Sequence, residues 1–452
     1  MNNTLTKLYM NQSARCFKFG TVVLVCCMSL VAGAGCSSEV QLMATPNMYL
    51  NHRRDPFPNV PPELQNNRVE VLYLTDRKHE EKSTPEKPIY GYGRSRAVYF
   101  GVSTVEIGKN VSWDQLAEAS RNEKRSVKLP LSVIQTKELV QFPATPRPLI
   151  EPVATTAPST RPWLIDDQIE SEKQRCVQEL SARLAKSPVK DVYLYVHGYN
   201  NDFNYSIMTI AQLWHFLGRQ GVPVAYSWPA ASGGILRGYT YDRESSEFTV
   251  YHLKETLRVI ASCPEVEKIH IIGHSRGTDV VVSALRELHL EFMGGGRSTR
   301  KELKLATLVL AAPDLDIEVV VQRMMTVRLG KVPEHFSMYI CQQDSALGIS
   351  SWLFGGRGRL GTLKSDMFST AELEALRRAK SIQIIDARIS DAGPSGHSYF
   401  YSNPAVSSDL IMLIRDGAEP GPERPLGADP KGFWFIDDKY PEPPKSKESK
   451  SK

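Results

Sequence analysis

The pentapeptide at residues 273–277 constrains the fold of this chain most, because it reads Gly-His-Ser-Arg-Gly between two apolar segments. Residues 268–272 before it have the composition of a buried strand, and residues 278–285 after it have the spacing of a buried helix. A G-x-S-x-G turn between a strand and a helix holds its serine in a strained conformation, with the hydroxyl directed into a cleft. Chance produces the bare pattern about once in seven chains of this length. The strand before the motif and the helix after it make a chance match much less common. The sequence therefore predicts that Ser275 is a nucleophile.

Apolar strands and amphipathic helices alternate around this motif. The expected strands are residues 192–196, 222–228, 269–272, 305–311, 336–341 and 381–386, and the expected helices are residues 205–219, 247–261, 278–292, 317–325, 371–379 and 406–415. Such alternation predicts a mainly parallel sheet with helices on both faces. Residues 69–75 and 97–105 are expected to form two earlier strands, with a hairpin as one way to join them. Together with the serine turn, this pattern predicts an α/β-hydrolase fold over residues 68–418.

The N-terminal residues 1–36 have the pattern of a bacterial export signal. Lys7, Arg15 and Lys18 precede an apolar run over residues 19–32, which is short for a membrane span. Cys36 would then be the lipidated first residue of a lipoprotein anchored to the bacterial cell envelope. Ordinary signal cleavage and an uncleaved anchor are the alternatives.

Three other segments differ in composition from the expected domain. Residues 37–67 are rich in Asn, Pro and Arg and are expected to be a tether. Residues 142–163 are rich in Pro, Thr and Ala, which predicts a surface excursion. Residues 419–452 are rich in Pro and Lys and are expected to be a disordered tail. The apolar cluster at 433–436 within this tail is expected to dock onto the body or onto a partner.

Composition argues against several other classes of protein. A net charge of +5 on 452 residues, without a basic stripe among aromatics, does not indicate nucleic-acid binding. Cys176, Cys263 and Cys341 are far apart, so they suggest neither a disulfide framework nor a metal site. Residues 356–361 match G-x-G-x-x-G, but no clear strand precedes them and no clear helix follows, so we expect a mobile loop. We therefore expect no metal and no cofactor.

A serine nucleophile needs a base, and the base needs a carboxylate that orients it. In the predicted fold these groups follow the serine in the order acid, then histidine. His397 lies in a loop after the last expected strand, at the carboxyl edge of the sheet where catalytic groups gather. His289 lies on the helix after the turn, and His335 precedes a strand and so belongs to the opposite edge. His397 is the predicted base.

Several aspartates are candidates for the acid. Asp344 follows the second strand after the serine turn, which is the usual place, and Asp314 is the next candidate. Asp316, Asp386 and Asp391 also lie near strand ends. Each of them has the alternative of a turn or helix-capping role.

Two backbone N–H groups are expected to stabilise an oxyanion. The N–H of Arg276, directly after the serine, is the first. The loop after the first strand of the alternation, residues 197–201, supplies the second, and we nominate Tyr199 with Asn200 as the alternative. His274 and the histidine that opens this loop are expected to be structural.

A set of motifs now points to one family. These motifs are His197-Gly198-Tyr199-Asn200, Tyr226-Ser227-Trp228-Pro229, Tyr241-Asp242, Gly273-His274-Ser275-Arg276-Gly277, Ala312-Pro313-Asp314-Leu315-Asp316 and Gly396-His397-Ser398. Together they resemble a bacterial α/β-hydrolase family that is esterase/lipase-like and of unknown function. The resemblance extends over about residues 68–415. It implies hydrolase activity with Ser275 as nucleophile, His397 as base and Asp344 as acid, and it implies no established substrate.

The resulting hypothesis is an exported serine hydrolase of carboxylic esters that forms an acyl-enzyme. Its substrate would be a small-molecule or lipid ester, although amides and thioesters share the same chemistry. The alternative is a non-catalytic surface-binding or scaffold lipoprotein on a hydrolase fold, which the tether and the apolar tail cluster favour.

Overall fold

The computed structural model of this chain describes residues 39–146, 162–230, 235–347, 359–363, 382–393, 396–429 and 432–442, without the side chains of 162–166 and 235–237. The fold below is that of the compact unit that begins at Leu42. The export signal, most of the Pro-rich excursion, the helix expected at 371–379 and residues 356–358 of the glycine-rich loop lie outside the described residues. No helix in the described ranges is long and apolar enough to cross a membrane.

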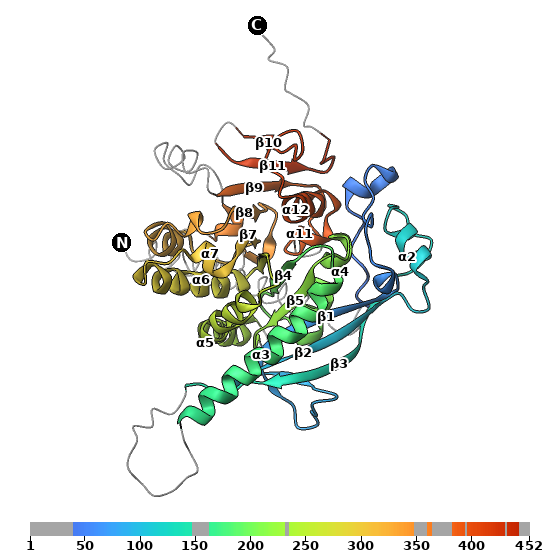
Figure 1. Ribbon diagram of the computed structural model, residues 1–452. Helices are drawn as coiled ribbons and strands as arrows, with labels where there is room; N and C mark the ends of the chain where they lie inside the picture. Colours follow the sequence, from blue (N-terminus) through green and yellow to red (C-terminus); the bar gives the residue numbers. More distant parts are fainter. Residues whose placement is uncertain are drawn as a thin grey trace, which may run out of the picture. The chain divides into compact units, whose positions relative to one another are not determined.

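One mixed sheet forms the centre of this unit (Figure 1). Among the described residues it has eleven strands in the order β10-β11-β9-β8-β7-β6-β4-β5-β1-β2-β3. Pairing is parallel from β1 through β5, β4, β6, β7, β8 and β9 to β11, and antiparallel for β1–β2, β2–β3 and β10–β11. The strands are β1 (Arg68–His79), β2 (Tyr90–Ile107), β3 (Leu131–Gln141), β4 (Asp191–Val196), β5 (Val222–Ser227), β6 (Lys268–His274), β7 (Leu305–Ala311), β8 (His335–Ile340), β9 (Gln383–Arg388), β10 (Gly427–Ala428) and β11 (Trp434–Asp437).

Helices cover both faces of this sheet. The main helices are α2 (Trp113–Ala119), α3 (Pro162–Lys186), α4 (Phe203–Phe216), α5 (Ile235–Ser262), α6 (Gly277–Gly294), α7 (Thr299–Leu303), α8 (Ile317–Val320), α11 (Tyr399–Ser402) and α12 (Pro404–Asp416). Val192 and Leu194 of β4 join the main apolar core with residues of α3, α5 and α6. Tyr195 stacks on Phe400 of α11, and neighbouring strand residues point to opposite faces. The face of the sheet that α11 covers is therefore opposite to the face covered by α3, α5 and α6.

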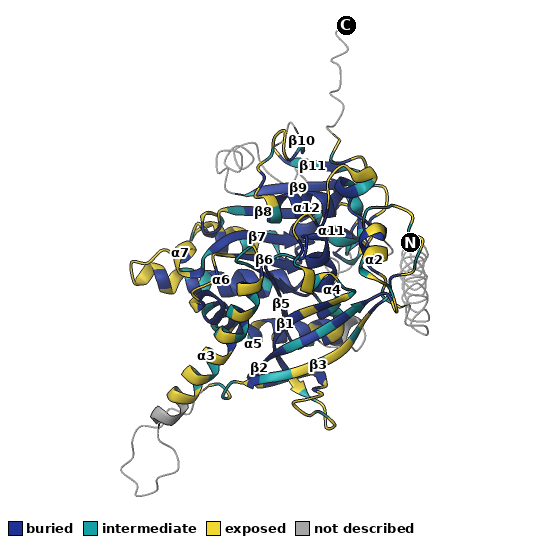
Figure 2. Cartoon of the chain, turned by 45° about the vertical axis from the view of Figure 1, so that its right-hand side comes forward, coloured by how far each residue is buried: buried dark blue, intermediate teal, exposed yellow. Residues whose placement is uncertain are grey.

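The central strands are buried along their whole length, which explains why they were visible in the sequence. Every residue of β5 and β7 is buried, and so is all of β6 except its first residue. Figure 2 shows these strands buried between their helices, whereas much of α3 is exposed. Continuous apolar runs are typical of parallel strands that are covered on both faces. The predicted mainly parallel sheet and the hairpin of the first two strands are confirmed; β3, whose pattern is mostly exposed or half-buried, was not predicted.

From Leu42 onward, the expected tether is folded against the body. Met48 and Tyr49 are almost fully buried. The Tyr49 hydroxyl donates to the Phe216 carbonyl at 2.7 Å, and the Met43 N–H donates to the Gln212 side chain at 2.8 Å. The expectation of a tether is therefore wrong from Leu42 onward. A few apolar anchors hold this segment, although its polar composition conceals them.

The expected disordered tail is also ordered in its described part. Arg424 is fully buried and pairs with Asp409 of α12 at 2.7 Å, and the Tyr440 hydroxyl donates to the same carboxylate at 2.6 Å. Strand β11 adds to β9 in parallel, so the apolar cluster at 433–436 docks onto the body. Disorder is thus wrong for residues 419–429 and 432–442, because a buried ion pair and a strand pairing fix them; residues 443–452 lie outside the described residues.

Candidate active site

Ser275 occupies the tight turn between β6 and α6. Its φ of 52° is in the left-handed region, where few residues other than glycine are found. Its N–H donates to the Ala311 carbonyl at 2.9 Å. A Cβ on Gly277 would lie 2.2 Å from the His197 carbonyl oxygen, so only glycine fits there. This is the strained serine turn that the motif predicts.

Asp344 and His397 are joined by a hydrogen bond. The Asp344 carboxylate is fully buried, and its Oδ2 lies 2.7 Å from Nδ1 of His397, whose side chain is 16% exposed. An ionised carboxylate only accepts hydrogen bonds, so Nδ1 carries the proton and Nε2 of the neutral ring is left as the acceptor. A Cβ on Gly396 would lie 2.5 Å from the Gln343 carbonyl oxygen, so glycine allows the two loops to approach. The two groups thus have the geometry of an oriented base.

His274 ties the loop of His397 to the serine turn. Its Nε2 lies 3.1 Å from the His397 carbonyl oxygen, and the two rings are 4.8 Å apart. Burial, and then repulsion by the protonated form of His397, lowers the pKa of His274 well below its usual range, so the His274 ring is neutral and donates from Nε2. No hydrogen bond joins Ser275 Oγ to His397 among the described residues. Such bonds often tighten only when substrate binds.

The second candidate acid, Asp314, has other partners. Tyr239 donates a short hydrogen bond to it, and Arg359 pairs with it at 3.2 Å. Its N–H also donates to the Ser275 carbonyl at 3.3 Å, so it braces the serine turn. The remaining aspartates have local roles: Asp316 caps α8, Asp386 pairs with Arg388, and Asp391 accepts from Gly393.

The two other downstream histidines also have structural partners. His289 contacts Thr299 Oγ1 at 2.8 Å and the Val327 carbonyl at 3.1 Å. His335 pairs with Glu419 at 2.8 Å. Neither contact joins these rings to Ser275.

The loop after β4 lies directly against the serine. A Cβ on Gly198 would come within 2.6 Å of Ser275 Cβ. The N–H of Asn200, the alternative donor, is already engaged, since it donates to Asp242 Oδ2 at 3.0 Å. No acceptor for the N–H of Arg276 occurs among the described residues. The loop after β4 therefore packs against the turn that carries Ser275.

Arg77, at the end of β1, was not found from the sequence. Its buried guanidinium donates to the Asn201 carbonyl at 2.6 Å and to Ser227 Oγ at 2.9 Å, and contacts His197 Nε2 at 3.3 Å. Burial lowers its pKa to about 10, so it is still charged at neutral pH. Arg77 thus fixes the loop that flanks Ser275. The only signal in the sequence is a charged pair, Asp76-Arg77, directly after an apolar strand.

His197 braces the same loop. Its Nδ1 lies 2.8 Å from the Gly198 carbonyl oxygen, and its ring stacks on Trp228 at 5.2 Å. Burial, and then the charge of Arg77, lowers its pKa to about 3. A ring that is neutral throughout the physiological range serves as a brace rather than as an acid or base.

Residues 172–416, just over half of the chain, match the family described as "Alpha/beta hydrolase of unknown function (DUF900)". The chain belongs to this family. The DUF900 match includes the serine turn, the loop after β4, Asp344 and His397, whereas β1 with Arg77 lies before it. The predicted family resemblance and the α/β-hydrolase fold are confirmed. No curated protein matches the chain.

Proposed function

We propose that this DUF900 protein is a serine hydrolase of carboxylic esters, with Ser275 as nucleophile, His397 as base and Asp344 as the acid that orients it. The observation that carries the proposal is the strained turn of Ser275, with a φ of 52°. His274 ties this turn to the loop of His397, whose ring bonds to Asp344 at 2.7 Å. Family membership supports a hydrolase in general, and the ester preference is the proposal itself.

The proposed reaction has two steps. Ser275 Oγ attacks the ester carbonyl carbon while Nε2 of His397 takes the hydroxyl proton, and the carbonyl oxygen becomes an oxyanion between the N–H groups of Arg276 and Tyr199. The C–O bond to the alcohol then breaks, and His397 returns the proton to the leaving alcohol. Water attacks the acyl-enzyme by the same route and releases the acid and free Ser275.

A fluorophosphonate probe tests the nucleophile directly. We expect the wild type to be labelled and Ser275→Ala to remain unlabelled. Ser283→Ala replaces another buried serine, which lies on α6. This variant is the matched control and should label normally. Absence of labelling in the folded wild type would favour the alternative, a binding or scaffold protein on a hydrolase fold.

We further propose that the protein is exported and anchored in the bacterial cell envelope through acylated Cys36, where it would meet small-molecule or lipid esters. The support is the sequence pattern of residues 1–36. Mass spectrometry of the mature N-terminus should find an acylated Cys36 in the wild type and loss of this species in Cys36→Ala. An unmodified N-terminus produced by cleavage at another residue would contradict the anchor.

A further inference from the structure

A cavity separate from the serine turn lies between α3, α5 and the first strands. Its apolar walls include Leu74, Val98, Phe142, Pro143, Ile169 and Val259. β1 is three strand positions from β6, which is about 14 Å at the usual spacing of strands. The space open to the centres of water molecules is about 60 Å³. That is room for roughly four to six waters, or for the alkyl chain of a small molecule.

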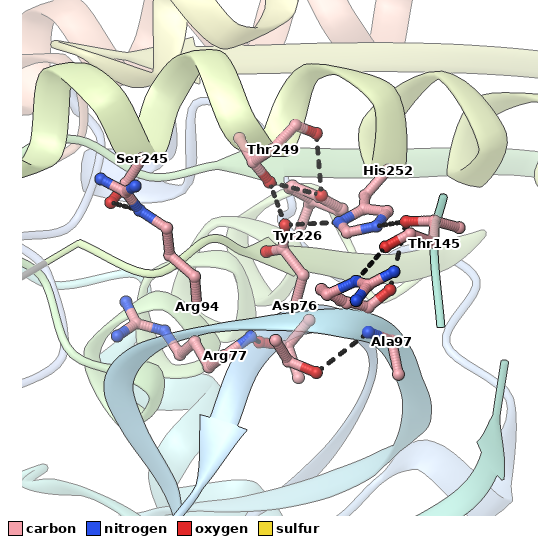
Figure 3. A network of polar contacts seen from close by, with 12 residues as sticks. Asp76, Arg77, Arg94, Ala97, Thr145, Tyr226, Ser245, Thr249 and His252 are labelled. Carbon is pink, nitrogen blue, oxygen red and sulfur yellow. Dashed lines mark hydrogen bonds and ion pairs between the residues drawn. The ribbon is translucent and has the colours of Figure 1, made fainter. Parts of the chain in front are cut away.

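A hydrogen-bonded network fixes two polar side chains in the wall of this cavity, His252 and Thr145 (Figure 3). His252 donates from Nδ1 to buried Asp76 at 2.8 Å, and its Nε2 meets Thr145 Oγ1 at 2.8 Å. Thr249 donates to the same Asp76 oxygen at 2.7 Å. Asp76 itself is not among the described residues that line the cavity, whereas His252 and Thr145 are. The wall is thus held by bonds within the fold before any ligand binds.

One polar group in the cavity has no partner. Thr256 lies one turn beyond His252 on α5, lines the cavity and is 2% exposed. Its Oγ1 forms no hydrogen bond with any described residue, although a helical threonine can bond to the carbonyl one turn back. A buried hydroxyl without a partner is destabilising and calls for an explanation. A ligand in the cavity would supply the missing partner.

Two lining side chains, Lys173 and Glu255, bring opposite charges to the described part of the cavity. Lys173 of α3 lines it and is half-buried, and its ammonium has no ion-pair partner among the described residues. The carboxylate that also lines the cavity, Glu255, is paired with Arg258. Of these two, Lys173 is therefore the one without an ion-pair partner among the described residues.

We propose that this cavity binds a short-chain carboxylic acid of roughly four to six carbons. The alkyl chain occupies the apolar walls, and the carboxylate meets the Lys173 ammonium and the Thr256 hydroxyl. The inference does not depend on the proposed hydrolase activity, since no residue of the proposed triad lines the described part of the cavity.

Calorimetric titration of the full chain with sodium hexanoate tests this inference. We expect saturable binding with one ligand per chain, at least tenfold tighter than binding of 1-hexanol. Lys173→Met keeps the length of the side chain and should remove the preference for the acid, with at least tenfold weaker binding of hexanoate. Thr256→Val keeps the shape and should weaken binding three- to tenfold. Lys186→Met, an exposed lysine of the same helix, should bind as the wild type does.

A diazirine analogue of hexanoate locates the ligand. Cross-links to peptides of α3 and α5 would support the cavity. Cross-links confined to peptides that contain Ser275 or His397 would overturn it, as would a folded wild type that shows no saturable binding. Unchanged affinity in Lys173→Met, with a melting temperature equal to that of the wild type, would also overturn it.

Discussion

Two buried aspartates each orient a histidine in this protein, and only one of the pairs is tied to the strained serine that we propose as a nucleophile. Asp344 bonds to His397 at 2.7 Å, and Asp76 bonds to His252 at 2.8 Å. The two differ in access, since the side chain of His397 is 16% exposed and that of His252 is 3% exposed. Both carboxylates are fully buried. A distance between an aspartate and a histidine therefore does not distinguish a catalytic pair from a structural one.

The difference lies in the backbone around each pair. The loop of His397 is tied to a serine with a φ of 52°, and Gly198 brings a backbone loop against that serine. His252 instead meets Thr145, whose own N–H donates to the Arg96 carbonyl at 2.8 Å. The Thr145 hydroxyl also donates to the Arg96 carbonyl, at 3.2 Å. The strained serine and the glycine loop packed against it therefore set the proposed catalytic pair apart from the other pair more clearly than the Asp–His distance does.

Replacing each aspartate by its amide should separate the two pairs most strongly. Asp344→Asn favours the wrong tautomer of His397, so we expect kcat for p-nitrophenyl esters to fall by about 10⁴. Asp76→Asn should leave kcat within about tenfold and lower the free energy of unfolding by about 1–3 kcal/mol, measured by urea denaturation. Equal losses of kcat in the two variants would contradict the proposal that only the Asp344–His397 pair is catalytic.

Gly198→Ala tests the backbone that distinguishes the two sites. The added Cβ would lie 2.6 Å from Ser275 Cβ, so the loop must move away from the serine. We expect kcat to fall by about 10²–10³, the usual cost of losing one oxyanion donor. Gly294→Ala has nothing within 4 Å of the new Cβ and should leave kcat unchanged. Wild-type kcat in folded Gly198→Ala would remove this loop from the mechanism.

Arg77→Met tests whether β1, which lies outside the DUF900 match, supports the proposed active site. The loss of its bonds leaves the Asn201 carbonyl without its charged donor. We expect roughly tenfold lower kcat and about 3 kcal/mol lower stability. Arg68→Met, at the exposed start of the same strand, is the control. If Arg77→Met lowers stability but leaves kcat unchanged, Arg77 is structural only.

The sequence predicts a region well where one short pattern specifies both backbone and chemistry. The serine turn was predicted because glycines, strand and helix all agree, and the Asp344–His397 pairing followed from their places at strand ends. The catalytic roles of these residues are still predictions. Arg77 could not be found in this way, because its function arises only when β1 and the loop after β4, more than a hundred residues apart, meet in the folded protein.

The two ends of the unit show the limit of composition as a guide. Residues 42–66 and 419–442 are polar and rich in proline, yet Tyr49 and Arg424 are fully buried. A single buried anchor contributes little to average composition, and the partner that buries it is remote in sequence. Arg424 pairs with Asp409, and neither residue has a sequence pattern that predicts this contact.

The smallest expected effect concerns the histidines that brace the active site without a carboxylate partner. The pKa of His197 is about 3 in the folded protein, against about 6.5 in an unfolded chain. Between these values the unfolded state binds more protons, so stability rises with pH up to about 6.5 and is lost as pH falls below it. Each such histidine contributes up to about 1.4 kcal/mol per pH unit in this window. His197→Gln should therefore reduce the slope of unfolding free energy against pH, measured by urea denaturation between about pH 5 and 6.5, by up to that amount. An unchanged slope would mean that His197 is protonated in the folded protein, and its assignment as a neutral brace beside Arg77 would fail.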